Sequence, residues 1–491
     1  MAPTKPTLDK DLSKITHVEA ATRSLANNFV AHGLAILFLG AAGVLAGIYA
    51  GIDTNTALIV FAAILGGYMA LNIGANDVAN NVGPAVGSRA MTLMTALIIA
   101  AIFESAGALI AGGDVVSTIS KGIIDPAQVP NSDVFIMAMM AALISAALWV
   151  NIATMIGAPV STTHAVVGGV MGGGIAAVGF GLVNWATMSK IAASWVISPL
   201  LGGVIAALFL FFIKANIIYR EDKIAAVRRW IPLLIAIMAG AFASYLAIKG
   251  LKRVWKADAA AVAMIGTGVF FATWALMHPL IKRQSEGMEN RNRSLRELFR
   301  LPLICSAALL SFAHGANDVA NAIGPLAAIL HSAEHDDIAA KAAVPAWIMV
   351  IGAFGISLGL FLYGPKLVRM VGDKITKMNP MRAYCVALSA AITVIIASWL
   401  GLPVSSTHIA VGAVFGVGFF REYYTSRSLR RLGMVTKSGD LPPARKGPEE
   451  IRQRKLVRRS HFLTIVAAWV ITVPAAAILS AIIFHALTLL R

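Results

Sequence analysis

Gly74-Ala-Asn-Asp-Val-Ala-Asn80 and Gly315-Ala-Asn-Asp-Val-Ala-Asn321 are identical stretches; each ends a long apolar run and is followed closely by Gly-Pro. Each stretch places one aspartate, Asp77 or Asp318, in membrane-like sequence. A charged side chain at the bilayer centre costs about 2.5–3.5 kcal/mol on insertion scales, so an intramembrane carboxylate indicates a functional site. Its repetition at matched positions predicts a site on a symmetry axis between two related halves.

The composition predicts an all-α polytopic membrane protein. Apolar residues make up 58%, charged residues 13%, and the mean hydropathy is +0.76, which excludes an ordinary soluble domain. A window of about 20 apolar residues per span predicts about 12–13 membrane segments. The predicted segments are 30–52, 57–75, 90–112, 134–156, 164–181, 189–214, 230–250, 259–281, 301–317, 343–364, 381–400, 404–420 and 461–490.

The basic residues predict the orientation. The net charge of +17 gathers in links between spans, as the positive-inside bias requires, and it does not indicate nucleic-acid binding. The links 215–229, 282–300 and 421–460 are rich in Lys and Arg, so we expect them to be cytoplasmic, together with the N-terminal tail. The links 113–133 and 331–342 carry acidic residues and are predicted to be external. The basic run Lys249–Lys256 does not fit this scheme.

A second pair of motifs, Gly157–His164 and Gly401–His408, repeats the pattern Gly-x-Pro-Val-Ser-x-Thr-His. The first motif pair is 241 residues apart (74 and 315), and the second is 244 apart (157 and 401). Order and spacing therefore predict a repeat. The basic links require opposite orientations for the two spans that carry the heptapeptides, so the repeat is predicted to be inverted, with broken helices or hairpins that meet at the bilayer midplane. The predicted units are 1–56 (tail and an extra span), 57–214 (first repeat), 215–300 (two connecting spans and basic links) and 301–491 (second repeat, with loop 421–460).

The hydroxyl-rich motif predicts an anion site. Pro followed by Ser and Thr reads as a helix N-terminus, where free N–H groups and the helix dipole attract anions. The candidate oxyanion donors are Ser161, Thr162, Thr163, Ser405, Ser406 and Thr407.

The heptapeptides predict cation binding, because side-chain oxygens and carbonyls freed where Gly-Pro interrupts a helix suit hard cations. The predicted cation ligands are Asp77, Asn80, Asp318 and Asn321, with Asn76 and Asn317 beside them. Neither motif contains Lys or Arg, so a divalent oxyanion beside two aspartates would gather about four negative charges, far more than a dipole of about half a charge offsets. Cations must therefore enter with the anion; sodium, protons and a divalent metal all remain open.

Glu104 is a third carboxylate in an apolar run, and alignment of the repeats places Gly355 opposite it. We predict a role in ion coupling, with structural hydrogen bonding as the alternative. His164 and His408 are candidate gates, or they hold a hairpin through one hydrogen bond. The glycines of 168–181 and 412–418 are best explained by close helix packing, and His314 is a weaker candidate for substrate contact.

Both duplicated motifs resemble the signature of the inorganic phosphate transporter (PiT) family, over roughly 57–214 and 301–490, with the span 30–52 outside the family core. The resemblance implies uptake of orthophosphate with a cation, and it implies that the duplicated positions, Asn76 and Asn317 included, line the site. Glu104 falls in a stretch similar to the family's Phe-Glu-x-x-Gly pattern. The short link between the halves resembles prokaryotic members, which implies a multi-pass protein of the inner (plasma) membrane and leaves the coupling ion open. Expected partners are inorganic phosphate and the lipid bilayer, with no resident cofactor and a homodimer as candidate assembly.

Two other functions fit parts of the sequence. A permease for sulfate or another tetrahedral oxyanion would share shape and charge with a phosphate carrier. An intramembrane serine hydrolase would pair Ser161 or Ser405 with His164 or His408, but a hydrolase needs one nucleophile and the pair is duplicated. We therefore expect no enzyme.

Overall fold

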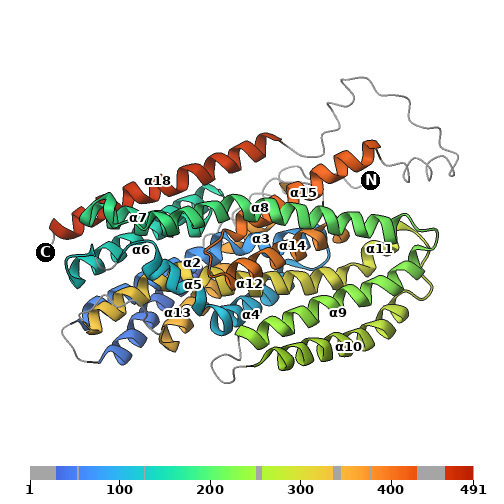
Figure 1. The fold of residues 1–491 in the computed structure, drawn as a ribbon, viewed down its shortest axis with the longest axis horizontal. Helices are drawn as coiled ribbons and strands as arrows, with labels where there is room; N and C mark the ends of the chain where they lie inside the picture. The colour runs from blue at the N-terminus through green and yellow to red at the C-terminus, as the bar shows by residue number, and fades with distance from the viewer. Residues whose placement is uncertain are drawn as a thin grey trace, which may run out of the picture.

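The computed structural model describes residues 29–51, 55–125, 128–158, 160–249, 257–335, 344–374, 378–427 and 459–489, and these ranges are almost entirely helical (Figure 1). Within them the only β pairing is an isolated bridge between Ile124 and Val183. The predicted N-terminal tail, the basic run after Lys249 and most of loop 421–460 lie outside these ranges.

Eleven described helices are long and apolar enough to cross a membrane, and the shorter apolar helix α7 adds to them. Each of the thirteen predicted segments coincides with a helix, so the all-α polytopic prediction is confirmed. The helices are Phe29–Ala50, α2 (Thr56–Asn76), α3 (Val78–Gly87), α4 (Leu93–Ala111), α5 (Gly113–Ser117), α6 (Ser132–Ile156), α7 (Thr162–Val178), α8 (Trp185–Ile213), α9 (Lys223–Lys249), α10 (Ala259–Gln284), α11 (Asn292–Leu298), α12 (Arg300–His335), α13 (Ala346–Lys374), α14 (Pro380–Trp399), α15 (Ser406–Arg427) and α18 (Arg459–Leu489), with π-helical turns at Thr118–Gly122 and Lys214–Ile218 and a 3-10 turn at Phe180–Leu182.

The two halves run in opposite directions and interlock. Asn55 precedes α2, and its Nδ2 donates to the carbonyl of Ala333 near the end of α12 at 2.7 Å, so α2 and α12 are antiparallel, as the predicted inversion requires. Helix α2 packs on α13 and α12 packs on α4, while α8 packs on α15 and α18 on α7. Each half therefore completes the core of the other.

Glycine allows the closest of these contacts. A Cβ on Gly172 of α7 would lie 2.1 Å from the carbonyl oxygen of Ala477, and a Cβ on Gly416 of α15 would lie 2.1 Å from that of Gly203. Only glycine permits backbones to approach so closely. The interpretation of the glycine runs as packing surfaces is confirmed at these positions.

Helices α4 and α13 meet at the symmetry axis. The hydroxyls of Ser105 and Ser357 lie 2.7 Å apart, and each also donates to a carbonyl of the facing helix, Ser357 to Ala101 at 3.0 Å and Ser105 to Ala353 at 3.4 Å. This reciprocal contact makes Ser105 and Ser357 equivalent, so the counterpart of the preceding Glu104 is Ile356. The predicted counterpart, Gly355, was wrong by one residue, because sequence spacing alone did not fix the register of these helices.

The predicted helix break at Gly-Pro was also wrong. Pro84 lies inside α3 and Pro325 lies inside α12, which runs unbroken for 36 residues. A proline removes one N–H and kinks a free helix, but α12 is buried along nearly its whole length and packing holds it through the proline. The interruption falls instead at Asp77, whose carbonyl accepts from both the N–H and the Nδ2 of Asn80, at 3.0 and 3.1 Å.

Candidate substrate and cation site

Two hairpins, α6–α7 and α14–α15, bring the hydroxyl motifs to the centre of the molecule. Each hairpin turns at a glycine in the left-handed region, Gly157 with φ of 75° and Gly401 with φ of 69°, which side chains other than glycine rarely adopt. The second arms, α7 and α15, then start at equivalent serines. Ser161 Oγ accepts from the N–H of His164 at 3.1 Å, and Ser405 Oγ accepts from the N–H of His408 at 3.2 Å.

The first asparagine of each heptapeptide ties its helix to a hairpin tip. Asn76 Nδ2 donates to Thr154 Oγ1 at 2.9 Å and to the carbonyl of Ala158 at 3.2 Å. In the other half, Asn317 Nδ2 donates to Ser398 Oγ at 2.9 Å. The structure thus uses the Asn76 and Asn317 amide groups to position the hairpins, and their predicted contact with phosphate stays a prediction. Thr154 and Ser398 carried no sequence signal of this role.

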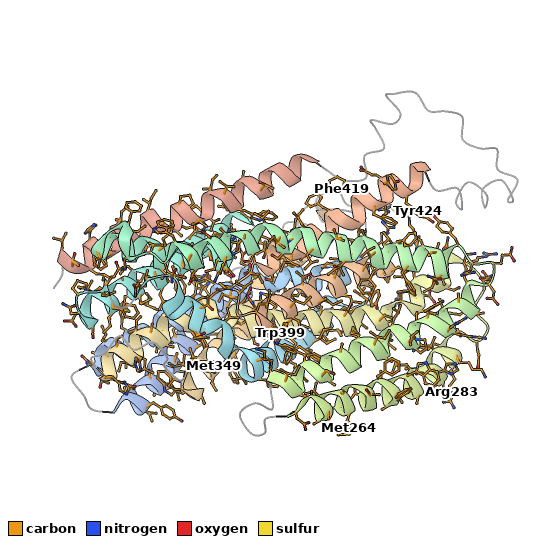
Figure 2. The ribbon with its side chains drawn as sticks, in the orientation of Figure 1. Met264, Arg283, Met349, Trp399, Phe419 and Tyr424 are labelled. Carbon is orange, nitrogen blue, oxygen red and sulfur yellow. The ribbon has the colours of Figure 1, made fainter. Side chains whose placement is uncertain are left out.

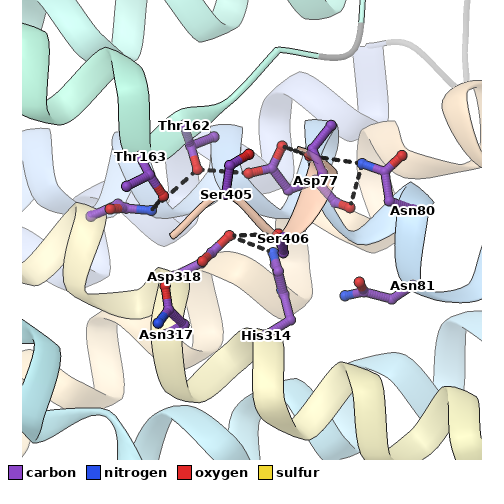
Figure 3. Close-up of polar contacts among 12 residues, drawn as sticks. Asp77, Asn80, Asn81, Thr162, Thr163, His314, Asn317, Asp318, Ser405 and Ser406 are labelled. Atoms are coloured by element: carbon purple, nitrogen blue, oxygen red, sulfur yellow. Dashed lines mark hydrogen bonds and ion pairs between the residues drawn. The ribbon is translucent and has the colours of Figure 1, made fainter. Parts of the chain in front are cut away.

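The two aspartates meet the hydroxyls of both hairpins (Figure 3). Thr162 donates to Asp77 Oδ2 at 2.6 Å, and Ser406 donates to Asp318 Oδ2 at 3.0 Å. Thr407, from the hairpin of the opposite half, donates to Asp77 Oδ1 at 3.1 Å. All five side chains are buried. The structure therefore brings together the carboxylates and hydroxyls that the sequence singled out.

The last asparagine of each heptapeptide reaches across to the opposite half. Asn80 Nδ2 donates to Thr407 Oγ1 at 2.9 Å, and Asn321 Nδ2 donates to Thr163 Oγ1 at 3.1 Å and to Thr162 Oγ1 at 3.2 Å. These bonds join the two halves directly at the site. A change in the relative position of the halves would have to break them.

A polar chain that the sequence did not predict as a unit extends from Asp318. His314 Nε2 lies 2.8 Å from Asp318 Oδ2, an ion-pair contact without hydrogen-bond alignment, and His314 Nδ1 lies 2.6 Å from Glu104 Oε2. Asn81 Nδ2 donates to Glu104 Oε1 at 2.7 Å. The available signal was position: His314 directly precedes one heptapeptide and Asn81 directly follows the other.

The two candidate gate histidines lie against each other. The rings of His164 and His408 are 4.4 Å apart at near right angles, and each lies on a tryptophan, His164 on Trp195 at 3.8 Å and His408 on Trp469 at 3.7 Å. His164 Nδ1 also approaches the carbonyl of Trp469 at 3.4 Å. The two buried histidine rings of α7 and α15 and the two half-buried tryptophan rings of α8 and α18 form one contact. Whether it acts as a gate stays a prediction.

Comparison with known proteins decides the family. Residues 73–480 match the Phosphate transporter family. The chain belongs to this family. A protein of Helicobacter pylori strain J99 with the name "Putative phosphate permease" is 45% identical over 97% of this chain and 98% of its own length. A protein of Pyrococcus abyssi, also named as a putative phosphate permease, is 36% identical, over 87% of this chain and 98% of its own.

A solved structure described as "The sodium-dependent phosphate transporter" is similar at a TM-score of 0.78 and 35% identity, covering 89% of this chain and 100% of its own. The predicted family resemblance is therefore confirmed, and this member of the phosphate transporter family is a multi-pass membrane protein.

In this family member the site gathers two acidic side chains beside one imidazole. One ligand atom each from Asp77, His314 and Asp318 lies within 4.8 Å of the others. Two ionised carboxylates at that separation repel by about 3–4 kcal/mol at an effective dielectric of about 20, and a single imidazole can offset only one charge. The hydrogen bonds and ion pairs described for these two aspartates include no Lys or Arg. The arrangement favours a bound cation.

Among the described residues, three buried amide or carboxylate oxygens in side chains of α12 accept no hydrogen bond: Oδ1 of Asn317, of Asp318 and of Asn321. A buried acceptor without a donor costs about 1–3 kcal/mol, and hard cations such as sodium bind carboxylate and amide oxygens. The residues present therefore fit a cation beside Asp318.

Proposed function

We propose that this protein is a symporter that imports inorganic phosphate together with a cation by alternating access. The observation that carries the proposal is the pair of buried aspartates, within 4.8 Å of each other together with His314, and enclosed by the hydroxyls of two hairpin tips. A carboxylate pair needs a cation, and hydroxyls at two helix N-termini suit an oxyanion. The site thus provides for both partners of a symport.

The anion is assigned to the hairpin tips. Helices α7 and α15 both begin at the centre, so their free N–H groups and dipoles act on the same point. Phosphate offers four oxygens as acceptors, and the hydroxyls of Thr162, Ser406 and Thr407, which donate to the aspartates in this structure, would turn to the anion when it binds. The proposed phosphate ligands are Ser161, Thr162, Thr163, Ser405, Ser406 and Thr407, with Asn76 and Asn317 as nearby amides.

The cations are assigned to the heptapeptides, through Asp77, Asn80, Asp318 and Asn321. Sodium, protons and a metal-phosphate complex all remain open for coupling. The solved relative is described as sodium-dependent, which makes sodium the first cation to test.

The Asn81–Glu104–His314 chain is assigned to coupling. A cation beside Asp318 competes with the imidazolium of His314 for the same carboxylate. Glu104, at 2.6 Å from the other ring nitrogen, can hold the imidazolium while Asp318 binds the cation. Loading of the cation site would therefore shift the main contact of the His314 imidazolium from Asp318 on α12 to Glu104 on α4. These two helices belong to different halves.

The test is uptake of radiolabelled phosphate into proteoliposomes of the purified protein, with sodium and proton gradients imposed separately and sulfate as competitor. We expect uptake that follows one gradient and ignores sulfate. Asp133→Asn, which removes an exposed carboxylate from the start of α6, is the matched control for changes at Asp77 and Asp318. Sulfate accumulation without phosphate uptake would overturn the substrate and favour the sulfate permease.

Glu104→Gln tests the coupling assignment separately. The substitution keeps the shape and the hydrogen bond to Asn81 but removes the charge facing His314. We expect a roughly tenfold loss of uptake, equivalent to about 1.4 kcal/mol, and a changed cation dependence. Unchanged uptake with unchanged cation dependence would contradict the role of Glu104.

The serine hydrolase receives no support from the geometry. Ser161 Oγ accepts a backbone N–H as a helix cap, and the ring of the nearby His164 is held by Trp195 and the carbonyl of Trp469. Labelling of Ser161 or Ser405 by a serine-reactive probe would be needed to revive this alternative.

A further inference from the structure

A second cluster of charge lies far from the aspartates, in a cavity of about 170 Å³ at the ends of four helical elements. Since liquid water takes about 30 Å³ per molecule, the cavity has room for a tetrahedral anion with some of its water. Among the described residues, its wall contains four basic side chains and no Asp or Glu. The lining residues that bear on the argument are Lys214, Arg296, Arg382, Arg421, Asn292 and Asn379.

Each basic side chain comes from a different element. Lys214 opens the π-helical turn after α8, Arg296 belongs to α11, Arg382 lies in the first turn of α14, and Arg421 lies near the end of α15. This is the end of the molecule at which the basic links gather, predicted to be cytoplasmic. In Figure 2 Tyr424, near Arg421 in sequence, and Arg283 both lie toward this end.

The positive charges of these side chains act on one another. Arg382 lies close enough to Arg296 and Arg421 to interact with the charge of both. Lys214 Nζ is 4.2 Å from the ring centre of Tyr424, and Glu422 offsets part of the charge of Arg421. Bringing several cations together at a partly buried surface is unfavourable unless an anion accompanies them.

The start of α14 adds a helix N-terminus to the cavity wall. Asn379 caps this 20-residue helix: its Oδ1 accepts the N–H of Arg382 at 3.0 Å and Arg382 Nε at 3.2 Å. The cap turns the guanidinium of Arg382 back toward the N-terminus. Guanidinium groups bind phosphate oxygens in pairs, and the positive end of a helix dipole favours the same ligand.

We propose that this cavity is a second anion site, selective for a phosphate group and distinct from the transport site. The ligand is a phosphate dianion, a phosphomonoester or the phosphodiester of an anionic lipid headgroup, held by Arg296, Arg382 and Arg421, with Lys214 completing the cluster. The chemistry is shared by a soluble phosphate and a lipid, and the experiment below separates the two sources.

The opposite end of the pseudo-symmetric molecule lacks the feature. At the 244-residue spacing of the hairpin motifs, the counterparts of Arg382 and Arg421 are Ala138 and Ala177. These alanines belong to an apolar cluster with Phe484. Basic residues at the base of a hairpin are therefore no requirement of the fold, and the cavity is particular to the end with the basic links.

Occupation of the site would affect the hairpin that carries Ser406 and Thr407. Arg382 and Arg421 lie on its two arms, while Lys214, on the π-helical turn after α8, and Arg296, on α11, lie outside it. A phosphate group bound to all four would fasten the base of the hairpin to its surroundings. Phosphate or lipid bound at this face would restrain the hairpin that carries part of the transport site. This feedback on transport rests on the proposed transport function.

The test counts phosphate bound to the full-length protein in nanodiscs by equilibrium binding of [32P]phosphate. In phosphatidylcholine we expect two phosphates per chain for wild type and one for R296Q/R421Q. R291Q/R293Q is the matched control, since it removes two exposed charges at the same α11 and should still bind two. R296K/R421K keeps the charge and should restore at least part of the second site.

In phosphatidylglycerol, a count of one bound [32P]phosphate for wild type identifies the lipid headgroup as occupant of the second site, and a count of two identifies soluble phosphate.

The outcomes for this site and for the transport site are distinguishable. If wild type binds one phosphate that R296Q/R421Q abolishes, the second site is upheld and the central phosphate site fails. If in phosphatidylcholine wild type binds one phosphate that R296Q/R421Q retains, or if R291Q/R293Q loses as much binding as R296Q/R421Q, the proposal is overturned.

Discussion

Asp77 and Asp318 occupy equivalent places in the two halves, but the surroundings behind them differ completely. Behind Asp318 runs the polar chain His314, Glu104 and Asn81. At the register fixed by the Ser105–Ser357 contact and the 241-residue spacing of the heptapeptides, their counterparts are Ile73, Ile356 and Ala322, each fully buried.

The backbone packing at this point is the same in both halves. A Cβ on Gly315 would lie 2.1 Å from the carbonyl oxygen of Glu104, and a Cβ on Gly74 would lie 1.9 Å from that of Ile356. Since the helices meet in the same way with isoleucines as with a charged pair, the charges are not needed for packing. The duplicated scaffold therefore builds the site, while only one half carries the additional titratable groups His314 and Glu104 beside its aspartate.

Neutralising the aspartates should give the largest effect in either half. Asp77→Asn and Asp318→Asn keep the shape of the side chain but remove the charge that a cation and the hydroxyl donors meet. We expect each to insert normally and to lower phosphate uptake by about 100-fold, equivalent to about 2.7 kcal/mol, in the range of lost charge-assisted contacts. Near-normal uptake in both variants, measured in proteoliposomes beside Asp133→Asn, would refute the paired site.

Copying the apolar half into the polar half should separate function from folding. E104I/H314I reproduces Ile356 and Ile73, and replacement of a buried charged pair by apolar residues is often neutral or stabilising. We expect an unfolding temperature near that of wild type, because the gain from the apolar pair is set against Asn81 Nδ2, which loses its Glu104 acceptor. Uptake should be lower by about 30-fold, since Asp318 loses an interaction of about 2 kcal/mol.

The single variant E104I is the control for the double variant E104I/H314I. It leaves His314 buried without Glu104, which should destabilise the protein by about 3–5 kcal/mol. If E104I and E104I/H314I unfolded at the same temperature, Glu104 and His314 would not act as a charged pair.

Duplicated motifs made the architecture and half of the site accessible from sequence. Two identical heptapeptides and two hydroxyl motifs have fixed spacing, so they predicted the repeat and a common site for the aspartates and the hydroxyls. The chain from Asp318 to Asn81 was harder to find because it is not repeated, and its contacts join α12, α4 and α3 from different halves. The contact of His314 with Glu104 could not be predicted, because the register of α4 against α12 depends on how the two halves interlock.

The cross-half hydroxyls should show a smaller version of the same asymmetry. Thr407 donates to the Asp77 carboxylate, whereas its counterpart Thr163 donates to the carbonyl of Val404 at 3.0 Å. A hydrogen bond to a charged group is worth about 1.5–3 kcal/mol and one between neutral groups about 0.5–1.5. We expect uptake to fall about tenfold in Thr407→Ala and about threefold in Thr163→Ala. Equal losses, measured as initial uptake rates at matched protein levels, would show that the neutral contact matters as much.

The smallest effects are expected where the two halves are most alike. Ser105→Ala and Ser357→Ala each remove the shared hydroxyl contact on the axis, and each should destabilise the protein by about 1 kcal/mol. The remaining serine keeps a carbonyl acceptor in both cases, but Ser357 retains a bond of 3.0 Å to Ala101 while Ser105 retains only the 3.4 Å contact to Ala353. Ser357→Ala should therefore lower the stability by a few tenths of a kcal/mol more than Ser105→Ala, about the difference between a good and a long hydrogen bond.

Thermal unfolding of both single variants and the double variant measures this difference directly. A large difference between the two would mean that the axis lies elsewhere, and the assignment of Ile356 as the counterpart of Glu104 would fall with it.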